Sequence, residues 1–331
     1  MDLKNEKVFN GIKKIKIKYI FEKSSRPTNY LIIVFSAFSA VGSPPAYNYY
    51  DTLLKYDCNK LFILDDYSER GCYYLGKDND FSIENSVVSL ITHIANQHSI
   101  KFDNIITCGS SKGGYAALYF AIKYGFGHVV AGAPQTLVGN FLRRTPDIIR
   151  FIVGDDSEKA IQYLNDLLYK VIENTEKLPE INIHVGEGDY HYKEHVMPFI
   201  DAINKKSHSI YLDLGNYNNH SDFPFYQRFI KRKIESIINS ILIKDGFPVI
   251  NDLSIDINNA DITVTTMATG NKIQYAWYVF NDDTRCHVEW YKDINKFTWR
   301  AIDKGRYKIL AFVKNVNGQT DSETSDYFDL Q

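Results

Sequence analysis

The sequence predicts an α/β domain, with a mostly parallel sheet and helices on both faces, followed by a small all-β sandwich. Up to about residue 240, short apolar segments rich in β-branched residues alternate with segments of helical periodicity. After Gly246-Phe247-Pro248 the helical pattern ends, and short runs that alternate apolar and polar residues take over. A chain of 331 residues also exceeds the usual size of one hydrophobic core. We therefore expect two domains, at residues 1–247 and 248–331.

The strands of the first domain are expected at short apolar runs, and its helices at amphipathic segments between them. The strand candidates are residues 12–22, 30–35, 60–64, 104–108, 129–133, 181–185 and 209–214. The helix candidates are residues 82–98, 115–124 and 226–243, together with a mostly helical stretch at about 136–179. In an α/β sheet such an insertion usually lies above the strand ends, so we expect residues 136–179 to form a lid.

The second domain is expected to be an immunoglobulin-like sandwich. Its strand candidates are residues 253–257, 261–266, 273–280, 285–291, 297–301 and 307–315. Turn signals such as Asn281-Asp282-Asp283 and Asp303-Lys304-Gly305 separate them. Six or seven short strands within about 80 residues are typical of two small sheets packed face to face.

Composition and charge exclude several classes of protein. With 38 basic and 40 acidic side chains the net charge is -2, which gives no reason to expect binding to nucleic acid. Residues Met1 to Lys18 lack the apolar core of a signal peptide, and the longest apolar run, Leu31–Val41, is too short to span a bilayer. The cysteines form no C-x-x-C pair and lie at Cys58, Cys72, Cys108 and Cys286. We expect a cytoplasmic protein without a transmembrane segment.

The strongest chemical signal is the run Gly109-Ser110-Ser111-Lys112-Gly113-Gly114. It contains G-x-S-x-G, in which the serine stands at a sharp turn and the small flanking residues let the turn approach neighbouring backbone. The motif follows the apolar run 105–108 and precedes the helical pattern 115–121, the strand and helix that such an elbow requires. These features predict an α/β-hydrolase fold with Ser111 as nucleophile. The alternative is a flexible turn or an anion-binding helix start, although no nucleotide-binding P-loop pattern is present.

A serine nucleophile needs a histidine base, and the fold fixes the order serine, acid, histidine along the chain. The histidines beyond the elbow and any plausible acid loop are His191, His195, His208, His220 and His287. His287 lies in the sandwich, His195 in a helical segment and His208 at the start of a strand. His191 is set aside because it is too close in sequence to the expected acid to face it across the site. His220 remains, in the polar loop 216–222 after the last strand.

The acid should follow the penultimate strand, and residues 181–185 lead directly into Gly186-Glu187-Gly188-Asp189. Asp189 is preferred, because 189 − 111 = 78 residues leave room for a strand and a lid, and 220 − 189 = 31 leave room for a helix and a strand. Glu187 is the reserve. A metal site with His184, His191 and His195 is a further alternative, but their spacing does not match H-E-x-x-H. We expect no metal.

An oxyanion hole needs two N–H donors, one from the residue after the nucleophile and one from the loop after an early strand. Lys112 supplies the first. Ala37 or Phe38, directly after the apolar run 31–35, is expected to supply the second, with an ordinary strand exit as the alternative. Asp65, Asp66 and Arg70 follow the next strand, where solvated loop charges are expected rather than cleft residues.

With these residues assigned, the chain from about residue 28 to 240 resembles a group of bacterial α/β-hydrolase proteins. The group includes accessory secretion-system acetyltransferases and a meningococcal-type capsule polysaccharide O-acetyltransferase. The resemblance rests on Phe35-Ser36-Ala37-Phe38, Gly109 to Ala117, Gly186 to Asp189 and Asn219-His220-Ser221-Asp222. It implies a serine that takes acetyl from acetyl-CoA and passes it to a sugar hydroxyl, with the triad Ser111, Asp189 and His220. No donor-binding residues carry over, and the sandwich lies outside the resemblance.

The leading hypothesis is therefore a serine O-acetyltransferase that acts on a bacterial surface polysaccharide or glycan through an acyl-Ser111 intermediate. A carbohydrate esterase is the first alternative, because a triad alone does not separate transfer from hydrolysis. The second is a non-catalytic glycan- or protein-binding module that uses the sandwich aromatics, for which a core role is the competing interpretation: Trp277, Tyr278, Trp290, Tyr291 and Trp299. In the lid, Arg143 and Arg144 are candidates to bind the phosphates of coenzyme A, with a solvated helix face as the alternative.

Overall fold

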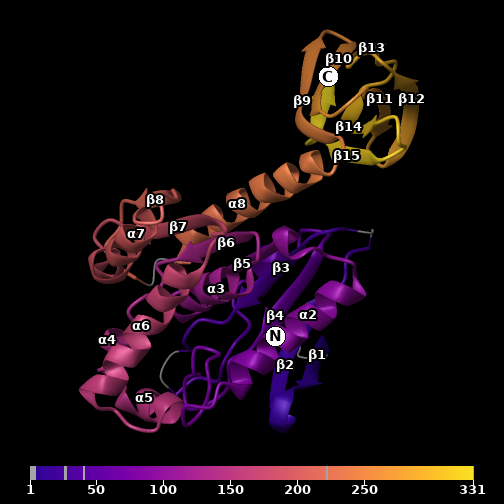
Figure 1. The fold of residues 1–331 in the computed structure, drawn as a ribbon. Coiled ribbons are helices and arrows are strands. Elements are labelled where there is room, and N and C mark those ends of the chain that lie inside the picture. The colour runs from indigo at the N-terminus through magenta and orange to yellow at the C-terminus, as the bar shows by residue number, and fades with distance from the viewer. Residues whose placement is uncertain (1–4, 26–27, 40–41, 221–222, 331) are drawn as a thin grey trace. The chain divides into compact units, whose positions relative to one another are not determined.

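The computed structural model describes residues 5–25, 28–39, 42–220 and 223–330 (Figure 1). The chain divides into two compact units, Met1–Glu235 and Ser236–Gln331. The division falls inside helix α8 (Phe223–Lys244), whereas we placed the domain boundary at residue 247. The sequence pattern marks the end of the helix, but it does not show that the first compact unit ends within it.

The first unit is built on an eight-stranded sheet in the order β1-β2-β4-β3-β5-β6-β7-β8. Strands β3 to β8 pair in parallel, and β2 runs antiparallel to β1 and β4. The predicted mostly parallel sheet is confirmed. In chain order the strands are Glu6–Asn10, Lys16–Glu22, Leu31–Phe35, Asn59–Ile63, Ile105–Ser110, His128–Gly132, Glu180–Gly186 and Ile210–Gly215.

The edge strand β1 was missed, and the expected strand 12–22 begins only at Lys16. In β1 no residue is fully buried, so its sequence lacks the apolar pattern that marks the central strands. Every residue of β3 and β4, by contrast, is buried, as expected of parallel strands covered on both faces.

Helices connect the parallel strands. Helix α1 (Tyr50–Leu53) and helix α2 (Ser82–Gln97) flank β4 in sequence, α3 (Lys112–Tyr124) joins β5 to β6, and α7 (Met197–Asn204) leads to β8. The main core cluster includes Ile33 from β3, Leu90 from α2 and Phe120 from α3, all with no exposed surface. This core fixes the ends of the strands, where the polar loops of the site begin.

The expected lid, residues 136–179, contains three helices: α4 (Val138–Leu142), α5 (Pro146–Val153) and α6 (Glu158–Asn174). Helix α6 begins at Ser157, whose hydroxyl accepts a hydrogen bond from the Ala160 N–H. Ile149 of α5 and Leu164 of α6 belong to the same core cluster as the sheet. The insertion is therefore packed into the first unit through its apolar faces.

The second unit is all-β and has two sheets, ordered β13-β10-β9 and β12-β11-β14-β15, with β16 paired to β14. Its core contains Trp277, whose indole N–H donates to Thr266 Oγ1 at 2.8 Å. At the start of β14, the Tyr307 hydroxyl donates back to the Asp303 carbonyl at 2.6 Å. From β9 to β16 the strands are Val249–Asn258, Asp261–Thr269, Gln274–Asn281, Thr284–Lys292, Lys296–Arg300, Gly305–Lys314, Thr320–Thr324 and Phe328–Leu330.

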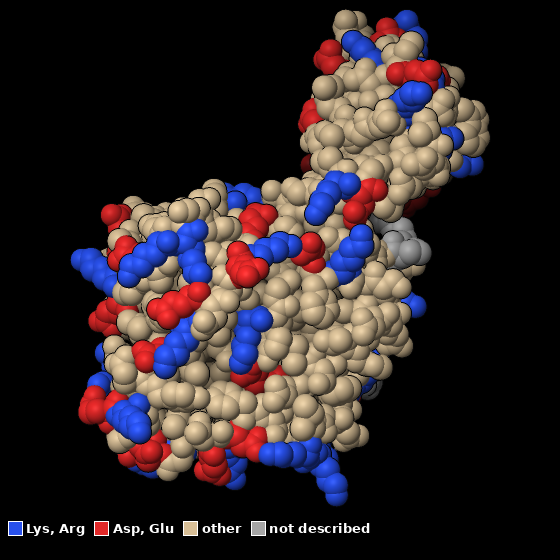
Figure 2. All heavy atoms as spheres, viewed as in Figure 1, with Lys and Arg blue, Asp and Glu red and all other residues tan. Residues whose placement is uncertain are grey.

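The surface carries both signs of charge. In Figure 2, lysine and arginine side chains alternate with aspartate and glutamate over the visible face, in keeping with the net charge of -2. Within the described ranges, no helix is both long and apolar enough to cross a membrane.

Candidate active site

Ser111 stands between the last residue of β5 and the first residue of α3, at a strained turn with φ 55° and ψ -116°. A Cβ atom on Gly109 would lie 2.6 Å from the carbonyl carbon of Gly113, and one on Gly113 would collide with the Phe35 carbonyl oxygen. Both glycines are therefore required by close backbone approach. The turn has the geometry expected of a nucleophile elbow, and it holds Ser111 at the carboxyl end of the central strand β5.

The Ser111 hydroxyl contacts a residue that the sequence analysis did not single out. Gln135, in the loop after β6, donates from Nε2 to Ser111 Oγ at 2.6 Å. Among the described residues, no hydrogen bond joins Ser111 Oγ to a histidine. Hydrogen bonds of this kind are often long in unliganded enzymes and tighten in the substrate complex.

Asp189 and His220 lie together, as their positions after β7 and β8 predict. The His220 Nδ1 atom is 2.8 Å from Asp189 Oδ2, with Asp189 buried and His220 partly exposed. Burial alone would raise the pKa of Asp189, but hydrogen bonds from His191 and His220 lower it to well below its usual range. Asp189 is thus a carboxylate that can hold the imidazole of His220 in the tautomer with Nε2 unprotonated. The reserve acid Glu187 is exposed.

His191 also contacts Asp189, so our reason for setting it aside was wrong. Its Nδ1 lies 3.0 Å from Asp189 Oδ1, and its backbone N–H donates to the same oxygen at 2.9 Å. The turn after Asp189 folds back and brings the two residues together. The His191 and His220 rings are stacked, with centroids 3.7 Å apart and planes 13° apart.

His195 extends this group of imidazoles. It lies in a π-helical turn (Tyr192–Val196), with its ring 5.1 Å from that of His191, and its Nδ1 accepts the Leu137 N–H. Burial, with a smaller contribution from the charge of His191, lowers the pKa of His195 to about 3. Burial likewise lowers the pKa of His191. Both side chains are therefore neutral at pH 7.

Asp189, His191 and His220 offer ligand atoms that lie within 4.8 Å of one another, a spacing that a metal ion can bridge. The two imidazoles, however, are nearly parallel, so their in-plane lone pairs point side by side rather than toward one point. His184, another histidine of the metal alternative, pairs with Asp213 at 2.7 Å instead. The arrangement fits hydrogen bonding to a shared carboxylate better than tetrahedral coordination.

The expected oxyanion donors differ in what they contact. Lys112 is the first residue of α3, a position whose backbone N–H has no partner within the helix. The Ala37 N–H already donates to Asn48 Oδ1 at 2.8 Å. Phe38 is therefore the better candidate for the second donor, and its ring packs 5.9 Å from that of Phe141.

The Lys112 side chain forms a buried ion pair that the sequence analysis missed. Its Nζ lies 2.8 Å from Asp65 Oδ2, and both side chains are almost fully buried. Asp65 also accepts hydrogen bonds from the backbone N–H groups of Cys72 and Tyr74. The expectation of a solvated loop charge at Asp65 was wrong, since the pair ties the elbow to the loop after β4.

Comparison with known proteins supports the fold. No protein-family model matches the sequence, and no curated protein matches it. The capsule O-acetyltransferase of Neisseria meningitidis serogroup A is similar in structure, with a TM-score of 0.60 and 23% identity over 70% of this chain and 93% of that one. A histidine-to-alanine mutant of the same enzyme in complex with CoA is similar to the same degree. Its TM-score is 0.61, at 23% identity over 69% of this chain and 94% of that one.

More distant similarities point to the same architecture. The Gap123 glycosylation-associated complex of Streptococcus agalactiae gives a TM-score of 0.60 at 17% identity, and this chain matches 47% of that one. An S-formylglutathione hydrolase of Staphylococcus aureus gives 0.53 at 14% identity. The first unit has an α/β-hydrolase-type fold.

Two lid arginines of this hydrolase-type unit differ in their surroundings. Arg143 forms a two-point ion pair with Glu158 at 2.5 and 2.6 Å, on the exposed surface. Arg144 lies over the ring of Tyr190, 5.7 Å from its centroid, and that ring is 4.1 Å from the ring of His191. Of the two, only Arg144 borders the histidine cluster, which consists of His191, His195 and His220.

A small pocket of about 20 Å³, room for about one water molecule, adjoins His220. His184 lines it, and its Nε2 is buried without a hydrogen-bond partner among the described residues. Tyr49 and Ser110 close one wall through a 2.6 Å hydrogen bond between their hydroxyls. The pocket is lined by Tyr49, Ser110, Gly132, Ala133, His184, Tyr217, His220 and Tyr226.

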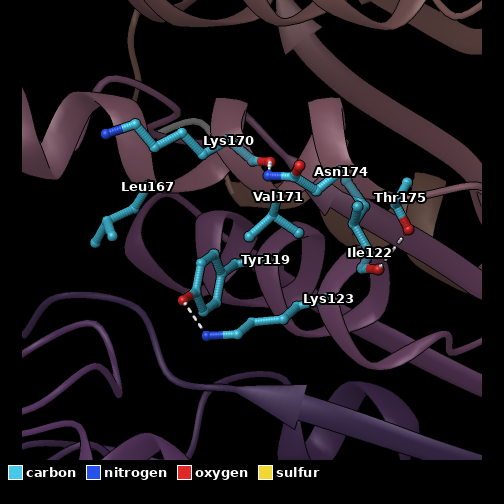
Figure 3. Close-up of a pocket in the computed structure, with 8 residues that line it drawn as sticks. All are labelled: Tyr119, Ile122, Lys123, Leu167, Lys170, Val171, Asn174 and Thr175. Atoms are coloured by element: carbon cyan, nitrogen blue, oxygen red, sulfur yellow. Dashed lines mark hydrogen bonds between the residues drawn. The ribbon is translucent and has the colours of Figure 1, made fainter.

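A larger hollow, of about 350 Å³, lies away from this site, between α3 and α6 (Figure 3). Tyr119 and Lys123 of α3 border it, joined by a 2.8 Å hydrogen bond. Tyr119 follows Ser111 by 119 − 111 = 8 residues, which is about 12 Å along a helix. The described residues that line the hollow include no serine, cysteine or histidine, so size alone does not locate the site.

Proposed function

We propose that the protein is a serine acyltransferase that moves an acetyl group from acetyl-CoA to a hydroxyl of a bacterial surface polysaccharide or glycan. The observation that carries the proposal is the Asp189–His220 pair at the strand ends next to the Ser111 elbow. The structurally similar capsule O-acetyltransferase, whose histidine-to-alanine mutant is in complex with CoA, supports acetyl-CoA as donor and a glycan as acceptor.

In the first half-reaction, Ser111 Oγ attacks the thioester carbonyl carbon while His220 Nε2 takes its proton. The carbon–sulfur bond breaks, and the coenzyme A thiolate leaves with the proton from His220. Asp189 stabilises the imidazolium, and backbone N–H groups of Lys112 and Phe38 bind the tetrahedral oxyanion. The product is acetyl-Ser111 and free coenzyme A.

In the second half-reaction, His220 removes the proton of the acceptor hydroxyl, whose oxygen attacks the acetyl carbonyl carbon. The bond to Ser111 Oγ breaks, and His220 returns the proton to that oxygen. Water in place of the sugar would give hydrolysis, so the esterase alternative uses the same residues. The structural similarity to S-formylglutathione hydrolases supports that alternative.

Mass spectrometry of the intact protein and of the Ser111 peptide after incubation with acetyl-CoA tests the proposal. We expect an adduct of roughly 42 Da at Ser111, as for any acetyl-enzyme. Ser111→Ala should abolish it, and Ser110→Ala, the matched neighbour, should retain it. An adduct that persists in Ser111→Ala, or that never forms in the wild type, overturns the nucleophile. Transfer to glycans faster than acetate release then separates transferase from esterase.

For the second unit we propose an immunoglobulin-like sandwich, supported by its two sheets, the buried Trp277 of β11 and the hydroxyl of Tyr307 bonded back to Asp303. We propose that this domain comprises residues 248–331. We also propose a cytoplasmic location, in keeping with four free cysteines, three of them buried.

A second candidate function is glycan binding by this unit, and Trp290 favours it. That side chain is 68% exposed, and its ring meets Tyr278, which in turn packs against Phe312. Arg285 lies over the Tyr278 ring at 4.9 Å, so the face combines aromatic rings with a cation. Trp290→Ala should weaken binding to an anionic glycan without changing acetylation of Ser111. Equal binding by the variant would exclude this surface.

A further inference from the structure

Gln135 is held in one orientation by a tyrosine hydroxyl. Both Gln135 and Tyr73 are buried, and the Tyr73 hydroxyl donates to Gln135 Oε1 at 2.7 Å. In this orientation Nε2 is the atom that faces Ser111 Oγ, at 2.6 Å, and the same nitrogen lies beside His191 Nε2. The amide therefore presents N–H groups, not its carbonyl, to the nucleophile.

The same Gln135 nitrogen also approaches His191. Its Nε2 lies 3.5 Å from His191 Nε2. Because Asp189 is ionised, it takes the proton-bearing Nδ1 of His191, and the neutral ring then has a lone pair on Nε2. One N–H of Gln135 is directed at Ser111 and the other at that lone pair.

These contacts connect Ser111 to Asp189 without passing through His220. The route runs from Ser111 through Gln135 and His191 to Asp189, whose other oxygen binds His220. We propose that Gln135 and His191 are positioning residues of the active site, Gln135 for the Ser111 oxygen and His191 for the Asp189–His220 pair. This inference rests on the proposed function, which assigns Ser111 as nucleophile and His220 as base.

Each positioning residue has a physical task. A hydroxyl oxygen accepts and donates at once, so the Gln135 N–H occupies one lone pair and leaves the Ser111 proton for His220. The same N–H stabilises the partial negative charge that Oγ carries while His220 removes its proton, before that charge passes to the oxygen of the attacked group. His191 binds one oxygen of Asp189 and stacks on His220, so it restricts the orientation of both side chains. Its hydrogen bond also stabilises part of the negative charge of the carboxylate.

Fluorophosphonate labelling tests the Gln135 assignment. In this reaction Ser111 Oγ bonds to phosphorus, fluoride leaves and His220 takes the serine proton. Gln135→Glu keeps the acceptor for Tyr73 but removes the N–H donors, and Gln135→Met removes both without adding charge. We expect both variants to label about 100-fold more slowly than the wild type, the usual effect of losing one such donor.

The control is Asn165→Asp, the same amide-to-carboxylate change at another buried amide, which binds Asn140 and not Ser111. It should label at the wild-type rate. Thermal melting of all variants separates loss of folding from loss of reactivity. Wild-type labelling rates in folded Gln135→Glu and Gln135→Met would overturn the role of Gln135.

The His191 assignment is tested by the pH dependence of labelling in His191→Phe, which keeps a stacked ring and loses the Nδ1–H. Asp189 then pairs with His220 alone and stabilises its charged form more, so the pH of half-maximal labelling should rise. Among the described residues, the other titratable or charged groups around His220 are Asp189, Tyr190 with Arg144 over it, His195, His184, Tyr49, Tyr217 and Tyr226. An unchanged or lowered midpoint overturns the role of His191.

A readout that needs no reactivity separates this inference from the proposed function. Imidazole ¹⁵N NMR at pH 7 should find His191 protonated on Nδ1 and bare on Nε2. The opposite tautomer would overturn the route through His191 even in an active enzyme. A wild type that is never labelled at Ser111 contradicts the proposed function instead, whereas the expected tautomer would still support the network.

Discussion

The two units bury different kinds of side chain. At the carboxyl edge of its sheet the first unit buries the ion pair Lys112–Asp65 and the carboxylate Asp189. Among the described residues of the second unit, the buried polar side chains are Thr266 and Asn315, both uncharged. Buried charge contributes little net stability, because desolvation offsets much of the attraction. The first unit therefore keeps its buried charges for what they position, whereas the described core of the second unit is stabilised by uncharged side chains.

Breaking the buried ion pair should have the largest effect. Lys112→Met leaves Asp65 as an uncompensated buried carboxylate, and we expect the free energy of unfolding to fall by about 3–5 kcal/mol. The measurement is urea unfolding of the first unit. Adding Asp65→Asn should restore part of the loss, since the amide oxygen still accepts backbone N–H groups.

The matched control is Arg143→Met, which breaks the exposed pair with Glu158. An exposed pair contributes little to stability, so this variant should unfold almost as the wild type does. Equal losses in the two variants would mean that burial does not distinguish these ion pairs.

In the second unit, the strongest expected effect comes from packing and one hydrogen bond. Trp277→Phe removes the indole N–H from Thr266 and leaves a small void, which should cost about 2 kcal/mol. Trp290→Phe, at an exposed position, should change stability by less than about 0.5 kcal/mol. Fluorophosphonate labelling of Ser111 should be unaffected in both variants, and a slower rate would mean that the units are not independent.

The sequence predicts those parts of the site that depend on local structure. The elbow needs only a strand, a turn with glycines and a helix, all contiguous around Ser111. Asp189 and His220 follow strand ends, and parallel pairing of β6, β7 and β8 brings those ends to one edge of the sheet. The order of the strands therefore predicted that Asp189 and His220 lie together, and their side chains are 2.8 Å apart.

The missed residues depend on tertiary contacts. Gln135 and Asp65 are single polar residues in loops, where most such residues are solvated, and no spacing rule links either to Ser111. His191 was set aside because a residue so close in sequence to Asp189 was not expected to face it across the site, yet a turn brings the two residues together. The signals that remained were weak ones: a glutamine three residues after the end of a buried strand, and a histidine pair four residues apart, His191 and His195.

Acid should destabilise the first unit through its buried neutral histidines. The pKa of His195 is lowered to about 3 from an ordinary value near 6.5. Between these values the unfolded chain binds a proton that the folded chain does not, so stability is complete above pH 6.5 and is lost as pH falls. From pH 6 to 5 the loss should be about 1 kcal/mol larger in the wild type than in His195→Asn.

His195→Asn keeps an acceptor for the Leu137 N–H, and His93→Asn, at an exposed position, is the control. Chemical unfolding at both pH values gives the measurement. If His195→Asn loses as much stability as the wild type over this interval, His195 does not titrate as a buried neutral group.

The smallest expected effect concerns the edge of the site. Arg144 borders the histidine cluster through Tyr190, whereas its neighbour Arg143 is held by Glu158. If Arg144 meets the phosphates of coenzyme A, Arg144→Ala should raise KM for acetyl-CoA about threefold and leave kcat unchanged, because an exposed charge contributes modestly and equally to ground and transition states. Arg143→Ala should leave both constants unchanged. A fall in kcat for Arg144→Ala would instead indicate that Tyr190 and His191 shift when the guanidinium is removed.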